Sequence, residues 1–239
     1  MRENHKTGAA ILGLFICIGL TALGYLLGNA AIEYKQFDRS VMVKGLSERE
    51  YEADIVIWPI KFSATGNDLE SLYDTIEKST DLIKTFLINS GISQQEITFS
   101  SPSITDKSAQ QYGNNTRAEF RYTAFQTVTV YSKNISVVRA VMSSLSELGK
   151  QGIVFTGGDY QSQTEYLFTR LNEVKPEMIE EATTKARAVA EKFSADSKSR
   201  LGKIKKASQG QFSITSRDKN NPHIKKVRVV STVEYYLVD

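Results

Sequence analysis

The chain has 239 residues, of which 41% are hydrophobic and 24% are charged. This composition is close to the globular average, so it excludes wholesale disorder and a polytopic membrane protein. Thirty Lys and Arg against 27 Asp and Glu give a net charge of +3, too weak a bias to predict nucleic-acid binding. One cysteine and two histidines exclude an internal disulfide and predict no Cys/His zinc site.

The first 32 residues predict a membrane anchor. Residues 7–32 carry no charged side chain, and 26 helical residues at about 1.5 Å each span roughly 39 Å, enough for one tilted crossing of the bilayer. Arg2 and Lys6 precede the segment and Glu33 follows it. The positive-inside rule then places the N-terminus in the cytoplasm and the rest of the chain outside the plasma (inner) membrane.

A cleaved signal peptide is the alternative. Ala22-Leu23-Gly24 offers the small residues of a cleavage site, but apolar sequence continues through Leu27, beyond the roughly 7–15 residues of a signal peptide's apolar region. We therefore predict an uncleaved anchor. Bulky Ile16 before Cys17 argues against a lipoprotein cysteine, so Cys17 is predicted to face lipid.

Three parts are predicted: a tail and anchor (1–32), a polar spacer (33–40) and an exported domain (41–239). The domain should alternate strands and helices. One helix begins at an Asn67 N-cap followed three residues later by Glu70, and ends at Asn89-Ser90-Gly91. The predicted strands are 41–47, 55–62, 96–104, 119–131, 151–161, 165–169, 203–214 and 225–238, and a second helix covers 134–149. Pro59 predicts an edge position or a bulge, and a polar loop is expected at 105–118.

A third helix should run from Asn172 or Pro176 to Lys198. Its predicted buried stripe consists of Met178, Ala182, Ala186, Val189 or Ala190, and Phe193. Alanines four residues apart permit close approach to a neighbour, either a sheet or another helix, of the same chain or of another protomer.

The order of elements in 67–131 returns in 172–238, with poor side-chain identity between the two. Antiparallel hairpins with helices on one face predict an α+β fold of two βαβ-like halves.

The residues resemble the SIMPL-domain family of bacterial exported proteins, often described as oxidative-stress defence proteins. The matching stretches are Val43-Lys44-Gly45-Leu46-Ser47-Glu48, with Ser47 in place of a second glycine; Ala53-Asp54, which keeps only the acid of a Pro-Asp; Gly91-Ile92 before Ile97; Val128-Thr129-Val130; Gly152-Ile153-Val154-Phe155; and the alanine helix leading to Leu201-Gly202. The resemblance covers about 41–238. It implies a two-part α+β fold and a tendency to form homo-oligomers, and it supplies no catalytic residue.

Few residues carry chemistry. Asp54, Asp159 and Glu165 could meet as an acid pair or cation site, although solvated carboxylates at strand ends are the default interpretation. His5 falls in the predicted cytoplasmic tail and His223 in a polar loop, so no triad can form within one protomer. Gly157-Gly158-Asp159 is interpreted as a turn. We predict no catalytic, cofactor-binding or metal-binding residue.

The segment 198–228 is strongly basic. Its interpretation as a solubilising face competes with contact to anionic lipid, to a cell-wall polymer or to an acidic patch of a neighbouring protomer. The basic residues are Lys198, Arg200, Lys203, Lys205, Lys206, Arg217, Lys219, Lys225, Lys226 and Arg228, opposed only by Asp218.

The preferred functional hypothesis is a membrane-anchored, non-enzymatic SIMPL-type protein that self-associates on the exported side and supports envelope integrity or stress tolerance. The alternative is a tethered binding module for a small ligand, peptide or envelope polymer, held in a pocket between the two halves. An enzyme ranks third because no matched nucleophile and base stand out.

Overall fold

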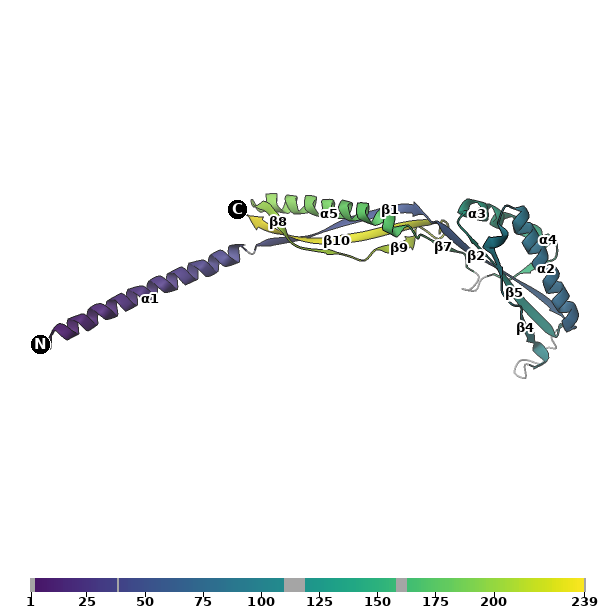
Figure 1. Ribbon diagram of the computed structural model, residues 1–239, viewed down its shortest axis with the longest axis horizontal. Coiled ribbons are helices and arrows are strands. Elements are labelled where there is room, and N and C mark those ends of the chain that lie inside the picture. Colours follow the sequence, from purple (N-terminus) through teal and green to yellow (C-terminus); the bar gives the residue numbers. More distant parts are fainter. Residues whose placement is uncertain (1–2, 38, 110–118, 158–162, 239) are drawn as a thin grey trace. The chain divides into compact units, whose positions relative to one another are not determined.

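The computed structural model describes residues 3–37, 39–109, 119–157 and 163–238 (Figure 1). It is a mixed α/β structure with antiparallel sheets and an N-terminal apolar helix, α1 (Glu3–Phe37). The chain divides into two compact units. Unit 1 comprises residues 1–48, 176–212 and 228–239, and unit 2 comprises residues 49–175 and 213–227.

Helix α1 is longer than the predicted anchor. It continues past Ile32 to Phe37, so most of the predicted spacer 33–40 is helical. Every side chain from Ile11 to Glu33 is exposed, which is the pattern of an apolar helix that has no protein neighbour to bury it.

Unit 2 is built on a sheet in the order β3-β5-β2-β6, in which β4 also pairs with β5 and β7 with β2. The long central pair is antiparallel, with a continuous register from Val56 opposite Ser132 to Gly66 opposite Tyr122. The strands are β2 (Ile55–Gly66), β3 (Ile97–Phe99), β4 (Ser103–Asp106), β5 (Tyr122–Ser132), β6 (Val154–Phe155) and β7 (Glu165–Leu167).

The register explains how Pro59 is tolerated inside β2. Pro59 lies opposite Thr129 of β5. On the other side of β2, β7 pairs with residues 55–57 and β6 with residues 62–63, which leaves Pro59 between them. Among the described residues no strand pairs with Pro59 on that side, a position that suits a residue without an N–H to donate.

The helices of unit 2 pack on this sheet through large apolar side chains. They are α2 (Leu69–Asn89), α3 (Ile135–Ser144) and α4 (Ser146–Lys150), with short 3₁₀ turns at Gln94–Glu96 and Lys107–Ala109. The core of unit 2 includes Trp58, Phe62, Leu72, Ile83 and Leu87, each at most 6% exposed.

Four sequence expectations in unit 2 need correction. The N-cap of α2 is Asp68, whose carboxylate accepts a hydrogen bond from the Ser71 N–H, whereas Asn67 accepts one from the Arg121 N–H. The strand expected at 96–104 is divided into β3 and β4 around Pro102, and the helix expected at 134–149 is divided at Leu145. Of the strand expected at 151–161, only Val154–Phe155 is a strand, and residues 158–162 lie outside the described part.

Besides α1, unit 1 contains most of α5 and most of a sheet in the order β1-β10-β8; β9 also pairs with β10. Antiparallel pairing of β10 with β8 runs from Ser231 opposite Gln209 to Val238 opposite Arg200, with two register shifts. The elements of this sheet and its helix are β1 (Ser40–Glu52), α5 (Leu171–Asp196), β8 (Arg200–Gln209), β9 (Ser213–Ser216) and β10 (Ile224–Val238). All of β9 and the ends of β1, α5 and β10 at residues 49–52, 171–175 and 224–227 belong to unit 2.

Helix α5 approaches β1 so closely that their backbones touch. A Cβ atom built on Gly45 would overlap the carbonyl oxygen of Ala182 and would lie 2.5 Å from the backbone nitrogen of Ala186. Only glycine fits there, and only small helix residues permit the approach. The neighbour of the alanine stripe is therefore β1 of the same chain.

The stripe itself differs in part from the prediction. Met178, Ala182, Ala186 and Ala190 are fully buried, but Ser194 completes the face. Of the alternatives Val189 and Ala190, Ala190 is the buried one and Val189 is 38% exposed; Phe193, the other expected residue, is 54% exposed because the helix turns it away from the sheet. The helix begins at Leu171, which puts Pro176 inside it, beyond the first turn.

The two units share an order of elements. In unit 2, β2 is followed by α2, then by β3 and β4, which both pair with β5. The other set has β1, then α5, then β8 and β9, which both pair with β10. In both sheets the last strand of the set lies between the first strand and the strands that follow the helix.

Candidate functional site

The N-terminal helix is the first feature with a functional meaning. The segment Ile11–Glu33 has the length and composition of a membrane-spanning helix. A membrane anchor and a signal peptide both fit these properties. Cys17 lies exposed on this helix, where a small apolar residue would face lipid.

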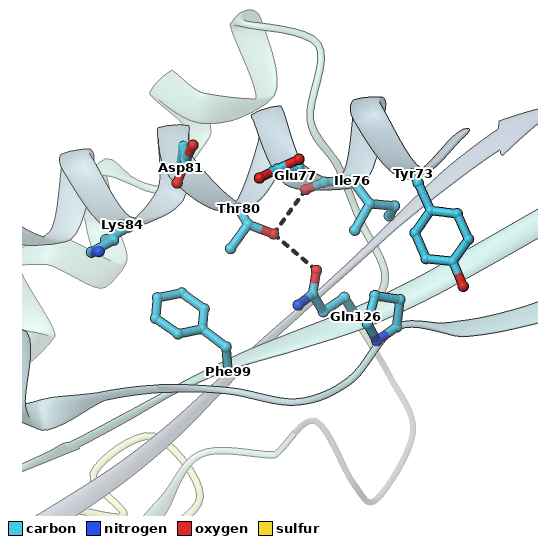
Figure 2. Close-up of a pocket in the computed structure, with 9 residues that line it drawn as sticks. Tyr73, Ile76, Glu77, Thr80, Asp81, Lys84, Phe99 and Gln126 are labelled. Atoms are coloured by element: carbon cyan, nitrogen blue, oxygen red, sulfur yellow. Dashed lines mark hydrogen bonds between the residues drawn. The ribbon is translucent and has the colours of Figure 1, made fainter. Parts of the chain in front are cut away.

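A groove in unit 2 combines aromatic, apolar and charged side chains in its lining (Figure 2). It has a volume of about 510 Å³, within the range of small-molecule sites. Helix α2 forms one wall, and the other wall comes from β3, the following turn and β5. The lining residues are Tyr73, Ile76, Glu77, Thr80, Asp81, Lys84, Phe99, Pro102 and Gln126.

The floor of the groove is a fixed hydrogen-bond network. Thr80 Oγ1 donates to Gln126 Oε1 over 2.8 Å, and Gln126 Nε2 donates to the Ser100 carbonyl oxygen over 2.8 Å. Figure 2 shows Thr80 and Gln126 meeting between α2 and the strands. Because Gln126 is only 8% exposed and both ends of its amide are bonded, the network holds α2 at a set distance from the strands.

The rim of the groove offers two kinds of contact. Tyr73 and Phe99 are 50% and 41% exposed, so aromatic surface is accessible on both walls. Glu77 and Asp81 lie on successive turns of α2 and add carboxylates, and Lys84 adds a cation. This combination suits a ligand with an apolar body and a polar or cationic end.

A second, smaller hollow of about 250 Å³ surrounds His223. The Nε2 atom of His223 lies 3.0 Å from Nη1 of Arg139. A guanidinium can only donate, so Nε2 accepts and the ring is the neutral tautomer with its proton on Nδ1. Burial and the adjacent Arg139 cation lower the pKa of His223, which favours that neutral form.

Asp54, the first predicted acid, has a structural role. Its carboxylate accepts hydrogen bonds from the Thr169 N–H at 2.9 Å, the Thr169 hydroxyl at 3.1 Å and the Arg170 N–H at 3.2 Å. Arg170 Nε adds an ion pair at 3.3 Å. Asp54 thus fastens the start of β2 to the chain after β7.

The other predicted chemical residues do not join Asp54 in a described site. Glu165 is exposed on β7 opposite Ile57, and Asp159, with the Gly157-Gly158-Asp159 turn, extends beyond the described residues. The side chain of His5 also lies outside them. Within the described ranges, no group of three or more His, Cys, Asp or Glu side chains is close enough to hold a metal ion.

The basic segment 198–228 places three of its lysines on the edge strand β8. The register of β8 shifts between Lys206 and Ile204, so Lys205 is an extra residue in the strand. Lys205 pairs with Glu234 at 3.4 Å and lies over the Tyr236 ring. Lysines and bulges on an edge discourage pairing with a foreign strand, which gives this part of the basic segment a protective role.

Taken together, these features define a mixed α/β chain of two units behind an apolar N-terminal helix. Residues 41–233 match the family model named SIMPL and described as a protein of unknown function (DUF541). The chain belongs to this family. No curated protein matches the chain at a significant level.

The family motif at the start of the domain now has a physical explanation. Gly45 admits α5, as described above, and buried Ser47 donates a hydrogen bond to Glu181 Oε2 of the same helix over 2.9 Å. At Gly202, a Cβ would lie 2.9 Å from the Tyr236 carbonyl oxygen. These residues therefore shape the packing of unit 1.

Sequence reasoning did not find the groove or the Arg139–His223 contact. Thr80 and Gln126 are 46 positions apart, and Arg139 and His223 are 84 apart. No local pattern joins such residues, since the packing of helices α2 and α3 against a strand and a turn brings them together. The exposed aromatic Tyr73, beside the buried Leu72, was the one available signal for the groove.

Proposed function

We propose that this protein is a non-enzymatic, membrane-anchored member of the SIMPL family that self-associates through its exported domain and supports envelope integrity or stress tolerance. Helix α1 is retained as a single crossing of the plasma (inner) membrane, with the N-terminus in the cytoplasm. The non-enzymatic assignment is supported by Asp54, whose carboxylate is occupied by backbone donors and Arg170.

The observation that carries self-association is exposed apolar surface in unit 1. Val43 and Gly45 of β1 face α5, so Met42 and Leu46 point to the opposite face of the sheet, where they are 64% and 40% exposed. Phe193, on the solvent side of α5, is a separate exposed apolar side chain and is not part of this sheet face. A soluble domain gains by covering such side chains, and a second copy of the same chain is always available to do so.

The test is the mass of the full-length protein in detergent, measured by light scattering with the detergent contribution subtracted. A multiple of 26.7 kDa is expected. A monomeric mass at every protein concentration would contradict the proposed self-association. Met42→Ser should lower the mass, whereas Met178→Leu, a change inside the buried stripe, should leave it unchanged.

Topology has its own test. Protease added to intact spheroplasts should digest the part of the chain that follows Glu33. A mature N-terminus near Tyr25 or Ile32, found by N-terminal sequencing, would instead show that the helix is a signal peptide.

A tethered binding module is the second candidate, and the groove between α2 and β3 favours it. Basic envelope peptides or small amphipathic amines would match Tyr73, Phe99, Glu77 and Asp81. A monomeric protein whose groove resonances shift on addition of such a compound would favour this function over self-association.

A further inference from the structure

His223 lies at a contact between a turn and helix α3, where protonation of its ring would change the interaction with Arg139. It stands at the end of the turn that joins β9 to β10, and its carbonyl oxygen accepts a hydrogen bond from the Ala53 N–H over 2.8 Å. Its ring reaches Arg139 in the first half of α3, with 3.0 Å between Nε2 and Nη1. The ring therefore connects the turn to α3.

The turn itself is a small, well-bonded body. Asp218 accepts hydrogen bonds from the Asn220 and Asn221 N–H groups, both at 2.8 Å. The Arg217 N–H donates to the Ile224 carbonyl oxygen, which closes the hairpin. Because the turn holds its own shape, it can leave α3 without unravelling.

The surroundings of the imidazole disfavour a second proton. The Nδ1 atom is buried and has no hydrogen-bond partner in the structure. Protonation would place two cationic donors, His223 and Arg139, face to face at hydrogen-bonding distance, where neither can accept. Burial, Arg139 and Arg217 lower the pKa of His223, whereas Glu52 and Asp218 act to raise it.

Two more elements border the ring. Lys133, just before α3, lines the same hollow and adds positive charge. Tyr166 of β7 lies with its ring centre 6.0 Å away, and burial raises the pKa of that phenol, so it stays neutral. The net surroundings are cationic and partly dry.

We propose that the His223–Arg139 contact is an acid-sensitive latch that holds the β9–β10 turn against α3 at neutral pH and releases it when the imidazole is protonated. The released turn solvates both N–H groups of the imidazolium and separates it from Arg139. The docked ring has a lower pKa than the free ring, so it binds a proton more weakly. Each pKa unit of this difference makes proton binding tenfold stronger in the released state than in the docked state.

The sign follows from that preference. The docked state binds the proton more weakly than the released state, so docking is complete above the pKa of a free histidine, near 6.5, and weakens as the pH falls below it. At still lower pH, below the pKa of the docked ring, the release reaches a plateau.

The experiment is hydrogen exchange by mass spectrometry on the full-length protein in detergent at pH 7.5 and pH 5.0, corrected for the intrinsic pH dependence of exchange. Peptides covering 217–224 and 134–140 should lose protection on acidification, whereas peptides of β5 should not. The titration of His223 is followed by NMR. The chain has two histidines, so the imidazole signal that disappears in His223→Gln is assigned to His223.

Two variants decide the outcome. His223→Gln keeps an acceptor for Arg139 without a titratable proton and should stay docked at pH 5.0. Arg139→Gln removes the opposing cation, so it should raise the pKa of the docked His223 ring and reduce or abolish the acid-dependent loss of protection. Equal loss of protection in the wild type and in both variants would overturn the latch, as would an unchanged wild type at pH 5.0 with His223 fully protonated.

Discussion

The two units achieve their packing in opposite ways. Unit 2 buries large side chains, such as Trp58, Phe62 and Leu87, between a broad sheet and its helices. The cluster in unit 1 is small and consists of Val43, Ala186, Ala190, Val233 and Tyr235, where α5 lies on β1 with only hydrogen or methyl groups between the backbones. The difference teaches that unit 2 should suffer most from lost volume and unit 1 from added volume.

The largest effect is expected from removing volume in unit 2. Phe62 is fully buried, so Phe62→Ala should lower the free energy of unfolding by about 3–5 kcal/mol through lost burial and an unfilled cavity. The single tryptophan, Trp58, lies in the same core and reports unit 2 in denaturant titrations followed by fluorescence. Leu82→Ala on the exposed side of α2 is the control and should change the transition little.

A smaller effect is expected from adding volume in unit 1. Ala186→Leu should destabilise unit 1 by about 1–3 kcal/mol because the leucine must displace β1. Gly45→Ala adds one methyl group on the β1 side of the same contact and should also destabilise unit 1. Ala188→Leu, on the exposed face of α5, should be nearly neutral because leucine is almost as good a helix former as alanine.

The measurement must report the stability of unit 1 and of unit 2 independently. Hydrogen exchange in peptides of α5 and β10 should speed up in Ala186→Leu and Gly45→Ala, whereas the Trp58 transition should move less than in Phe62→Ala. If both variants match Ala188→Leu, the contact between β1 and α5 is looser than described and the contrast between the units fails.

The smallest effect is a gain. Lys198 has a φ of 56°, a left-handed conformation at the end of α5, where Ser199 N–H bonds to Ser194 carbonyl and Lys198 N–H to Ala195 carbonyl. Glycine is the preferred residue at this position of such a helix end. Lys198→Gly should therefore raise the unfolding free energy of unit 1 by roughly 0.5–1 kcal/mol, measured by exchange in α5. Lys192→Gly, in the body of the helix, should instead lower it by about 1 kcal/mol.

Local patterns predicted the elements better than their ends. The spacing of Leu72, Ile76 and Ile83 indicated α2, and all three are buried. The N-cap was displaced by one residue because Asn67 and Asp68 are both good caps, and only the tertiary bond from Arg121 to Asn67 distinguishes them. Pro102, which interrupts the β3–β4 stretch, was a visible signal that the prediction of one strand at 96–104 did not use.

The alanine helix shows where such patterns stop. Four-residue spacing correctly indicated Ala182, Ala186 and Ala190 as one face, but Phe193 was assigned to it by hydrophobicity, and Ser194 has that place. Small size governs this face more than apolar character does, because the partner is backbone at Gly45. The groove and the His223 contact depend on the packing of α2 and α3 against residues far away in the sequence, which no local pattern encodes.

Most of unit 2 lies between β1 and α5 in the sequence, and this determines the order in which the two units can fold during synthesis. The buried residues of the large core cluster of unit 2 lie between Ala53 and Tyr166, so this cluster is complete in the chain before α5 is made. Strand β1 cannot pair until β10 has been synthesised. Ser40 of β1 hydrogen-bonds to Glu234 of β10, which is 194 positions later in the chain. At a synthesis rate of 5–20 residues per second, β1 is therefore without its partner strand for roughly 10–40 s. A chain truncated before residue 224 would retain the residues of the unit 2 core but leave β1 without its partner strand, and an unpaired strand edge is the surface from which aggregation starts.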